Sequence, residues 1–454
     1  MTTLSPEAAR GLIPPALTDM MLDSLYAVGG SVRDTVMGRV PNDIDLCTPL
    51  LPDDVIRRAK AAGYRVIPTG IKHGTVTVML DGEPHEITTF RNDVETDGRR
   101  ATVEFTPILR DDLARRDFTI NAMAMDIYGR IHDPFDGIGD IRRCVVRCVG
   151  DPIRRFQEDL LRIIRAARFS STLGFSIDPV THDGMVQMAP GLRSEIGGLV
   201  SIERVRDECT KAFEKSERPS WFLRIMWELG VVQTIIPEMA NADDLIQDPR
   251  WHPEGSVWNH ILEVVDRADP GLRWHALFHD VGKCLVPDPQ PEGHNSFHGH
   301  DEAGMEVIAT IGDRLNLSND MIESIRVTTG MHMMPMMGAS TGPPTQRMIR
   351  RFQHRAGQHL PTVEAIIRAD TGPRYRPEWD SLFEAREQQN DVNQILRGQD
   401  LIDRGYKPGP EMGLILRRAF EHQLDTGETD IDVLVAAGTA APHMTTVDGA
   451  RKAE

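Results

Sequence analysis

The sequence predicts a small α/β domain followed by a long all-helical region. Between residues 22 and 140, short β-branched runs alternate with helical segments, a pattern typical of a mixed sheet with helices. From about residue 150 onward, apolar residues recur at i, i+3 and i+4, the spacing of amphipathic helices. With 454 residues the chain is too long for a single core. We therefore divide it into four parts, 1–140, 141–235, 236–340 and 341–454.

Four short runs account for the predicted sheet. The expected strands are SLYAVGG (24–30), DIDLCT (43–48), GTVTVML (74–80) and HEITTF (85–90). Between the first two, SVRDTVMG is expected to form a helix that ends at Gly38.

The helical region contains several clear amphipathic runs. They are QEDLLRIIRAARFSSTLG (157–174), IERVRDECTKAFEK (202–215), SWFLRIMWELGVVQTI (220–235) and VWNHILEVVDRA (257–268). GASTGPPTQ (338–346) is the best linker candidate, and a further helical segment extends to about residue 436. The last residues, APHMTTVDGARKAE, are expected to be frayed.

Composition narrows the classes of function. The net charge of −17 argues against general nucleic-acid affinity, because phosphate binding depends on Lys and Arg. A local basic surface can still bind a polyanion. The candidate arginines are Arg142, Arg143, Arg147, Arg154, Arg155, Arg162, Arg165 and Arg168.

The cysteines and the hydropathy of the chain indicate its cellular compartment. Five scattered cysteines indicate reduced thiols and a cytoplasmic protein. Cys144 and Cys148 lie close together, but no second pair completes a zinc site. No apolar run is long enough to cross a membrane, so no membrane partner is expected.

The first strand, helix and second strand hold a group of chemically active residues. Asp43 and Asp45 are one residue apart in a strand-like run, so both carboxylates are expected on one face, where they suit Mg²⁺. Gly29 and Gly30 allow the backbone to approach an anion closely. Arg33, in the first turn of the helix, adds a positive charge for a triphosphate. The alternative for the aspartates is a solvated strand end, but the combination indicates two-metal nucleotide chemistry.

Six motifs carry a resemblance to a known family. GGSVRDTVMGRVPNDIDL (29–46) is similar to the signature of class II tRNA nucleotidyltransferases, the CCA-adding enzymes, and of the related bacterial poly(A) polymerases. The others follow in family order: RRDFTINAMAMD (115–126), DPFDGIGDI (133–141), EDLLRIIRAARF (158–169), SIERVRDE (201–208) and RGQDLIDRGYKPGPEMGLIL (397–416). The resemblance implies a polymerase-β-like nucleotidyltransferase head, a neck for base recognition and RNA binding, an HD-type helical body and a tRNA-binding tail.

The resemblance also implies roles for single residues. Asp117 and Asn121 would contact the ribose, and Arg116 a phosphate. Arg165 and Arg168 would belong to the nucleotide-binding set. Glu86 is either a third metal carboxylate or an exposed strand residue. The polar segment 91–105 corresponds to a flexible loop that the family needs for the switch to A addition.

Base choice is assigned to the 158–169 segment. On a helix, Asp159 and Arg162 would share a face, and a carboxylate beside a guanidinium can bond the edge of a nucleobase. The structural alternative is an ordinary ion pair from Glu158 to Arg162. The resemblance favours base recognition.

A second constellation lies in the helical body. His260, the pair His279-Asp280 and His300 are expected to converge on a divalent ion, a pattern that resembles the HD phosphohydrolase superfamily. At the place of the closing ligand the chain reads TTGMHMMP (328–335), which offers His332 but no aspartate. We therefore expect weak metal binding, and we interpret MHMMPMM (331–337) as a packing surface.

These observations lead to one leading hypothesis and three alternatives. The protein is expected to add C, C and A to the 3′ end of tRNA from CTP and ATP with Mg²⁺, with an additional HD-centred phosphohydrolase activity and its own divalent metal. A poly(A) polymerase is disfavoured because GIKHGTVTVML (70–80) resembles the CCA type. An HD hydrolase with a nucleotide-binding head is disfavoured by the intact Asp-x-Asp, and a non-catalytic RNA-binding protein by the acidity of the chain. The oligomeric state is left open.

Overall fold

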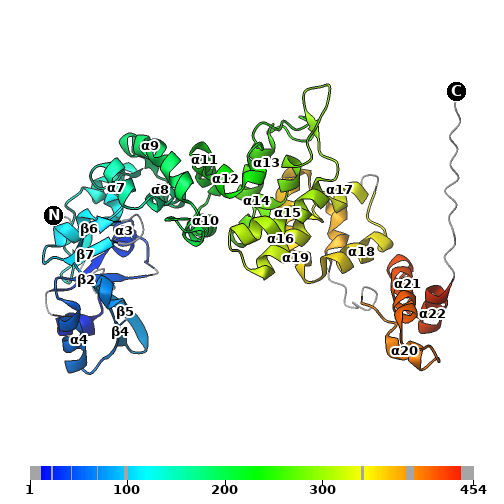
Figure 1. Cartoon of the computed structure of the whole chain (residues 1–454), viewed down its shortest axis with the longest axis horizontal. Helices are drawn as coiled ribbons and strands as arrows, with labels where there is room; N and C mark the ends of the chain where they lie inside the picture. The colour runs from blue at the N-terminus through cyan, green and yellow to red at the C-terminus, as the bar shows by residue number, and fades with distance from the viewer. Residues whose placement is uncertain are drawn as a thin grey trace. The chain divides into compact units, whose positions relative to one another are not determined.

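The computed structural model describes residues 12–21, 24–41, 43–68, 70–96, 101–338, 342–384 and 393–440, without side chains at 93–96, 101–103 and 337–338. The chain forms two compact units (Figure 1). The first consists of Met1–Asp243 with Ile311–Leu317, and the second of Asp244–Thr310 with Ser318–Glu454. Within the described part of the chain, no helix combines the length and apolarity needed to cross a membrane.

The first unit begins with a mixed seven-stranded sheet of order β3-β4-β5-β2-β1-β8-β9. The pairing of β2 with β5 is parallel, whereas the other pairings are antiparallel, which confirms the predicted mixed α/β head. The strands are β1 (Tyr26–Val28), β2 (Asp45–Thr48), β3 (Arg65–Ile67), β4 (Thr75–Leu80), β5 (Glu83–Thr89), β8 (Ala124–Asp126) and β9 (Ile131–His132).

Helices cover this sheet and close its core. They are α2 (Pro15–Met21), α3 (Gly30–Val36), α4 (Pro52–Ala61), α5 (Leu109–Ala114) and α6 (Gly137–Arg143). The core takes Leu46, Val76 and Ile87 from the central strands, each at most 1% exposed. Helix α3 ends at Val36, and Gly38 follows with φ 72°, so the predicted stop at this glycine is confirmed.

The polar segment 91–105 is more regular than its sequence suggests. It forms an antiparallel ribbon of β6 (Arg91–Thr96) and β7 (Ala101–Phe105), with an irregular register between Asp93 and Glu95. Residues 97–100 of the expected loop lie outside the described residues.

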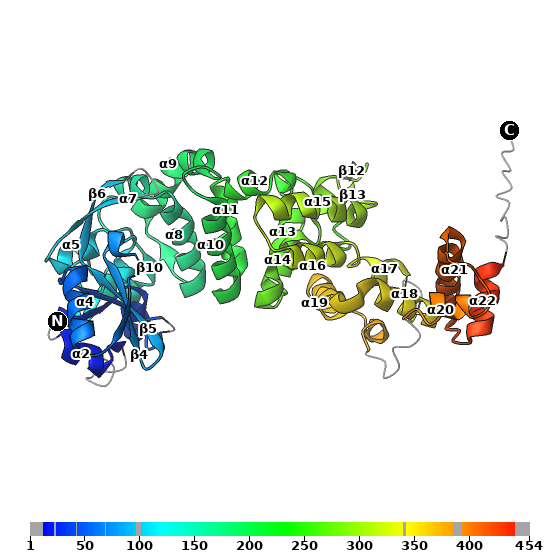
Figure 2. The same cartoon turned by 60° about the horizontal axis from the view of Figure 1, so that its bottom comes forward.

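The rest of the first unit is almost wholly helical. Its elements are β10 (Val145–Val146), α7 (Pro152–Glu158), α8 (Leu161–Leu173), β11 (Ser176–Ile177), α9 (Pro179–Glu195), α10 (Ile202–Lys215), α11 (Pro219–Glu228) and α12 (Val231–Ile235). Helices α8, α10 and α11 lie side by side (Figure 2).

One predicted helix is broken. The run 157–174 is divided at Asp159, which has extended backbone angles of φ −157° and ψ 106°. Its side chain accepts a hydrogen bond from the backbone N–H of Leu161 at 3.1 Å. This local bond competes with the helical one, as is common for aspartate, and starts α8 as a separate helix.

The second unit holds the remaining helices, except that the end of one of them, Ile311–Arg314, belongs to the first unit. Those before residue 340 are α13 (Val257–Arg267), α14 (Arg273–Phe278), α15 (His300–Arg314), α16 (Asn319–Thr329) and α17 (Met334–Gly338). Those after it are α18 (Gln346–Ala356), α19 (Leu360–Thr371), α20 (Gly398–Ile402), α21 (Pro410–Thr426) and α22 (Ile431–Thr439). Helix α19 packs against α13, α14 and α16. Residues 339–341 of the expected linker and the expected frayed end from 441 lie outside the described residues.

Candidate functional sites

The turn from β1 into α3 brings a glycine, a carboxylate and a guanidinium together. Gly29 has φ 73°, which a glycine adopts without strain. A Cβ atom at this position would lie 2.7 Å from Nη1 of Arg116 and 3.9 Å from Oδ2 of Asp45. Because Gly29 has no side chain, a small space remains between the Asp45 carboxylate and the Arg116 guanidinium, next to the first N–H groups of α3.

The two aspartates lie at the start of β2. Asp45 is its first residue, and Asp43 precedes the strand in a bend, so the strand is shorter than predicted. Both are exposed, and among the described residues neither forms an ion pair. Leu46 lies opposite Ile87 in the parallel register, which places exposed Glu86 level with Asp45 on the adjacent strand. Exposed carboxylates without protein cations fit a hard divalent ion.

Arg33 lies nearby but makes protein contacts. Its Nη1 donates to Oδ1 of Asn121 at 2.7 Å, and its Nε donates to Oδ1 of Asp34 at 2.9 Å. A Cβ at Gly30 would lie 3.6 Å from its Nη2, so the guanidinium lies close to the glycine turn. Arg33 therefore connects the turn to the 115–126 motif.

The ribose and base motifs are joined by a chain of charges. Asp117 accepts from Asn121 Nδ2 at 3.2 Å and from Arg165 Nε at 2.8 Å. Arg165 also faces Glu208 of α10, and Arg168 pairs with the same Glu208. Although burial opposes the shift, the charge of Arg165 and the hydrogen bonds from Arg165 and Asn121 lower the pKa of Asp117 to about 2. Both carboxylate oxygens of Asp117 thus already accept protein donors.

The predicted placement of Asp159 and Arg162 on one helical face is wrong, because Asp159 lies outside α8. Asp159 Oδ2 accepts from Arg204 of α10 at 2.7 Å, whereas Arg162 donates to Glu158 at 2.7 Å. The sequence pattern placed both on one helical face, but the break at Asp159 turns its side chain toward α10. The structure thus contains the ion pair of Glu158 with Arg162, which was the alternative interpretation of this segment. Arg204 carried no sequence signal beyond its place in the 201–208 motif.

Arg116 has a partner that the sequence did not suggest. Asp112, only 1% exposed, lies 2.8 Å from Arg115 and 3.5 Å from Arg116. The Asp112 carboxylate pairs with both guanidinium groups and so fixes Arg116 beside Gly29.

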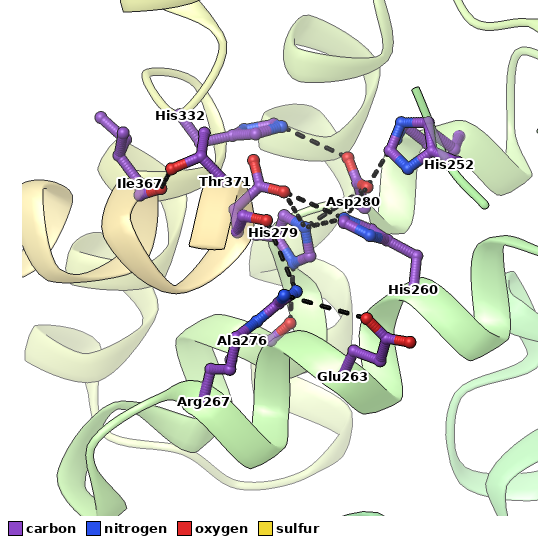
Figure 3. Close-up of polar contacts among 12 residues, drawn as sticks. His252, His260, Glu263, Arg267, Ala276, His279, Asp280, His332, Ile367 and Thr371 are labelled. Atoms are coloured by element: carbon purple, nitrogen blue, oxygen red, sulfur yellow. Dashed lines mark hydrogen bonds and ion pairs between the residues drawn. The ribbon is translucent and has the colours of Figure 1, made fainter. Parts of the chain in front are cut away.

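The second unit contains a dense histidine cluster. The Nε2 atoms of His260 and His279 lie 3.4 and 3.3 Å from Oδ2 of Asp280. Those of His300 and His332 each lie 3.3 Å from its Oδ1. Figure 3 shows His260, His279 and His332 directed at Asp280.

The hydrogen bonds on the far side of each ring determine where its lone pair points. The Nδ1 atoms of His279, His300 and His332 donate to backbone carbonyls of Ala276, Phe297 and Thr329. A carbonyl oxygen only accepts, so each of these Nδ1 atoms carries a proton, and in the neutral form of each ring the lone pair lies on Nε2.

These lone pairs face one another and a carboxylate. Nε2 of His260 lies 3.3 Å from that of His279, and Nε2 of His300 lies 3.3 Å from that of His332. Neither oxygen of Asp280 receives a well-directed hydrogen bond, although Lys283 Nζ lies 2.7 Å from Oδ2. Converging lone pairs around a buried anion repel one another unless cations lie between them, so the cluster fits divalent metal ions.

A carboxylate that the sequence did not reveal completes the cluster. Asp370 of α19 places Oδ1 3.0 Å from Nε2 of His260 and 3.9 Å from that of His279. The prediction that the metal-ligand set lacks its last carboxylate is therefore wrong. The interpretation of 331–337 as a packing surface is confirmed for Met331, Met334 and Met336, whereas His332 is fully buried within the cluster. Asp370 is far along the chain, and only the packing of α19 against α13 and α14 brings it to the site.

Charges of both signs are stabilised within the cluster. Burial disfavours the charged form of Asp280, but Lys283 and His279 hold its pKa well below the usual value. Burial likewise acts against protonation of His260, but the carboxylates of Asp370 and Glu254 raise its pKa.

A cavity of about 640 Å³ opens onto the cluster. Its polar lining includes Asp280, His300 and Asp370 together with Lys283 and Arg374. The apolar walls are aromatic or sulfur-containing. They are formed by Trp251, Phe297, Met333, Met336 and Trp379. The cavity can therefore take a molecule with an anionic end and an apolar end.

Three family models match this chain. The poly A polymerase head domain matches residues 25–147, and the probable RNA and SrmB-binding site of polymerase A matches 174–243. The HD domain matches 257–400, a range that includes Asp370.

Curated relatives and solved structures agree with these matches. The chain is 45% identical to the CCA-adding enzyme of Lactobacillus helveticus over 255 residues, 54% of this chain and 61% of that enzyme. It is 44% identical to the CCA-adding enzyme of Limosilactobacillus fermentum over 396 residues, 86% of each chain. The structure matches that of the Bacillus stearothermophilus CCA-adding enzyme in complex with CTP with a TM-score of 0.66 and 27% identity, over 94% of this chain and 97% of the other.

Three observations lead to one conclusion: the order of the matched domains, the two sites, and the 86% coverage by the Limosilactobacillus fermentum enzyme. This chain belongs to the family of the CCA-adding enzymes.

Proposed function

We propose that the first unit adds C, C and A to the 3′ end of tRNA, using CTP, ATP and Mg²⁺. The observation that carries the proposal is the meeting of Gly29, Asp45 and Arg116 at the turn into α3. In the proposed reaction the terminal hydroxyl of the RNA attacks the α-phosphate of the nucleotide, and pyrophosphate leaves.

The residues around this turn would have three different roles: metal binding, triphosphate binding and support of the turn. Asp43 and Asp45, with Glu86 level with Asp45, would hold Mg²⁺, which would supply activation of the hydroxyl and neutralisation of the leaving group. Arg116 would contact the triphosphate, next to the N–H groups exposed by Gly29. Arg33, bonded to Asn121, supports the position of this turn.

Base choice is proposed for the region where α8 meets α10. Asp159 offers a carboxylate that is 24% exposed, and its partner Arg204 is 36% exposed. Arg162 is 13% exposed and engaged by Glu158. To bond Asp159 or Arg162, an incoming base would have to replace Arg204 or Glu158 as the hydrogen-bond partner. Cytosine and adenine differ in their donors and acceptors, so each would form a different set of hydrogen bonds with these side chains.

The cytoplasm is the proposed location, because all five cysteines are free thiols in the structure.

Incubation of the protein with tRNA that lacks its CCA end tests this function. We expect labelled CTP to be added twice and ATP once, after which addition stops. Long A tails would instead indicate a poly(A) polymerase. Absence of any incorporation would exclude nucleotidyl transfer.

We further propose that the histidine cluster is a phosphohydrolase centre. The specific observation is the convergence of His260, His279, His300 and His332 on Asp280, with Asp370 as an additional carboxylate. Divalent ions bound there would polarise a phosphate ester and activate water. Lys283 lies on the cavity wall, where it can bind the phosphate, and the aromatic walls suit a nucleoside or similar group.

Hydrolysis of phosphate mono- and diesters in the presence of Mn²⁺, Ni²⁺ or Zn²⁺ tests this second activity. We expect turnover that His279→Ala removes. If no ester of either kind is hydrolysed with any of these metals, the phosphohydrolase proposal is wrong.

A further inference from the structure

Asp280 lies between two unequal halves that are formed by the other five ligand side chains. The Asp370 half consists of His260, His279 and Asp370, and it faces Oδ2 of Asp280. The His332 half consists of His300 and His332, and it faces Oδ1. Asp280 would therefore contribute one carboxylate oxygen to each half.

The halves differ in charge. Both share Asp280, but Asp370 adds a second carboxylate to one half only. Glu254, 8% exposed, adds a third negative charge behind His260. Lys283 lies 2.7 Å from Oδ2 of Asp280 and offsets one of these charges. The Asp370 half therefore keeps an excess of one negative charge over the His332 half.

The halves also differ in what holds their histidines. Three of the rings donate Nδ1–H to neutral backbone carbonyls. Only His260 donates to a carboxylate, Oε1 of Glu254, at 2.7 Å. A carboxylate acceptor fixes the tautomer, orients the ring and increases the electron density at Nε2 more than a carbonyl does.

Glu254 is itself held in place. The same Oε1 accepts from Nδ1 of His252 at 2.9 Å, and the His252 ring packs edge-on against His260 with centroids 4.7 Å apart. The preceding loop is closed by the bond from the Gln247 N–H to the Gly255 carbonyl at 2.9 Å. The carboxylate is thus a rigid part of the site. This rigidity matches what a second layer of metal ligands requires.

We propose that Glu254 is a positioning residue for His260 and that, because of it and Asp370, the Asp370 half binds the first divalent ion more tightly than the His332 half binds the second. This inference rests on the metal centre proposed above. It predicts an order of filling: the Asp370 half first, the His332 half second.

Calorimetric titration of metal-free, full-length protein with Mn²⁺ tests the proposal. The protein carries Asp43→Asn and Asp45→Asn, so that the head carboxylates do not contribute to the signal. Two steps of unequal affinity are expected. Glu254→Gln keeps the shape but removes the charge, and should weaken the first step about 10- to 100-fold while the second changes less than about threefold.

Three controls separate positioning from folding. The melting temperature of the metal-free Glu254→Gln protein should stay near that of the parent. Glu254→Asp, which retains the charge, should recover part of the first-step affinity. His252→Phe removes the other donor to Glu254 and should weaken the first step less than Glu254→Gln does, whereas Asp370→Asn should weaken it strongly.

Each outcome is decisive. Two equal steps in the parent, or equal weakening of both steps by Glu254→Gln, would overturn the unequal halves while leaving the metal centre standing. No effect of Glu254→Gln would overturn the role of Glu254. Absence of any Mn²⁺ binding by the second unit would overturn both this inference and the phosphohydrolase proposal.

Discussion

Asp117 connects the nucleotide-binding turn to the base-recognition helix. It is 8% exposed and accepts from Asn121 on the head side and from Arg165 on α8. A single carboxylate thus holds two motifs together, because buried donors and acceptors must find partners.

The depressed pKa of Asp117 predicts a pH dependence. Its pKa is about 2 in the folded protein, below the usual value of about 4 in an unfolded chain. The stabilisation, about 2 kcal/mol, is therefore complete above about pH 4 and is lost as the pH falls toward 2. We expect the melting temperature of the wild type to exceed that of Asp117→Asn at pH 7 and the difference to shrink progressively below pH 4.

Differential scanning calorimetry of both proteins between pH 7 and 3 measures this difference. Asp53→Asn, at an exposed position of α4, is the matched control for loss of one surface carboxylate. A difference between wild type and Asp117→Asn that grows as the pH falls would contradict the role given to Asp117.

At the scale of elements, the helix break at Asp159 positions a carboxylate toward α10. Because Asp159 pairs with Arg204 there, the two helices share the candidate base-recognition region. We expect Asp159→Ala to lose discrimination between CTP and ATP by about 10- to 100-fold while some transfer remains.

Single-nucleotide incorporation with CTP or ATP alone measures this change. Arg204→Ala, which leaves the carboxylate in place, should alter the preference less than Asp159→Ala does. Unchanged base preference in Asp159→Ala would remove this residue from base recognition.

The turn that follows His279 and Asp280 contacts α15 closely, and this contact depends on Gly282. A Cβ at Gly282 would lie 1.9 Å from the carbonyl oxygen of His300 and 2.6 Å from the backbone nitrogen of Gly304. Backbone atoms cannot move aside as a flexible side chain can, so the two segments would separate. We expect Gly282→Ala to lower the free energy of unfolding of the second unit by about 3 kcal/mol and to weaken metal binding.

Thermal unfolding and metal titration check this expectation together. Gly271→Ala is the control, because an added Cβ there meets no atom within 4 Å. If both variants behaved alike, the close approach would have no energetic importance.

At the scale of the whole molecule, the two candidate sites belong to different compact units and share no residue. Asp43→Ala is therefore expected to lower nucleotide addition about 10³-fold or more and to leave phosphohydrolysis unchanged. His279→Ala should have the reverse effect. Parallel assays of both activities on both variants measure this, and a variant that lost both activities would show that the sites depend on each other.

The sequence alone determined much of the molecule. The alternation of β-branched runs, the period of the apolar residues and the glycine at position 38 predicted the mixed sheet and most helices, because these signals act over a few residues. The motifs around Asp43 and His279 predicted both candidate sites, because Asp43 lies close to Asp45 in the chain and His279 is next to Asp280.

Only the tertiary structure decided the partners of these groups. Asp370 joins the histidines through the packing of α19, and Glu254 reaches His260 from a loop. Asp159 leaves its expected helical face because one local hydrogen bond to Leu161 outweighs helical continuity. Such contacts depend on packing between segments far apart in sequence or on a balance between competing bonds, and neither leaves a periodic pattern in the chain.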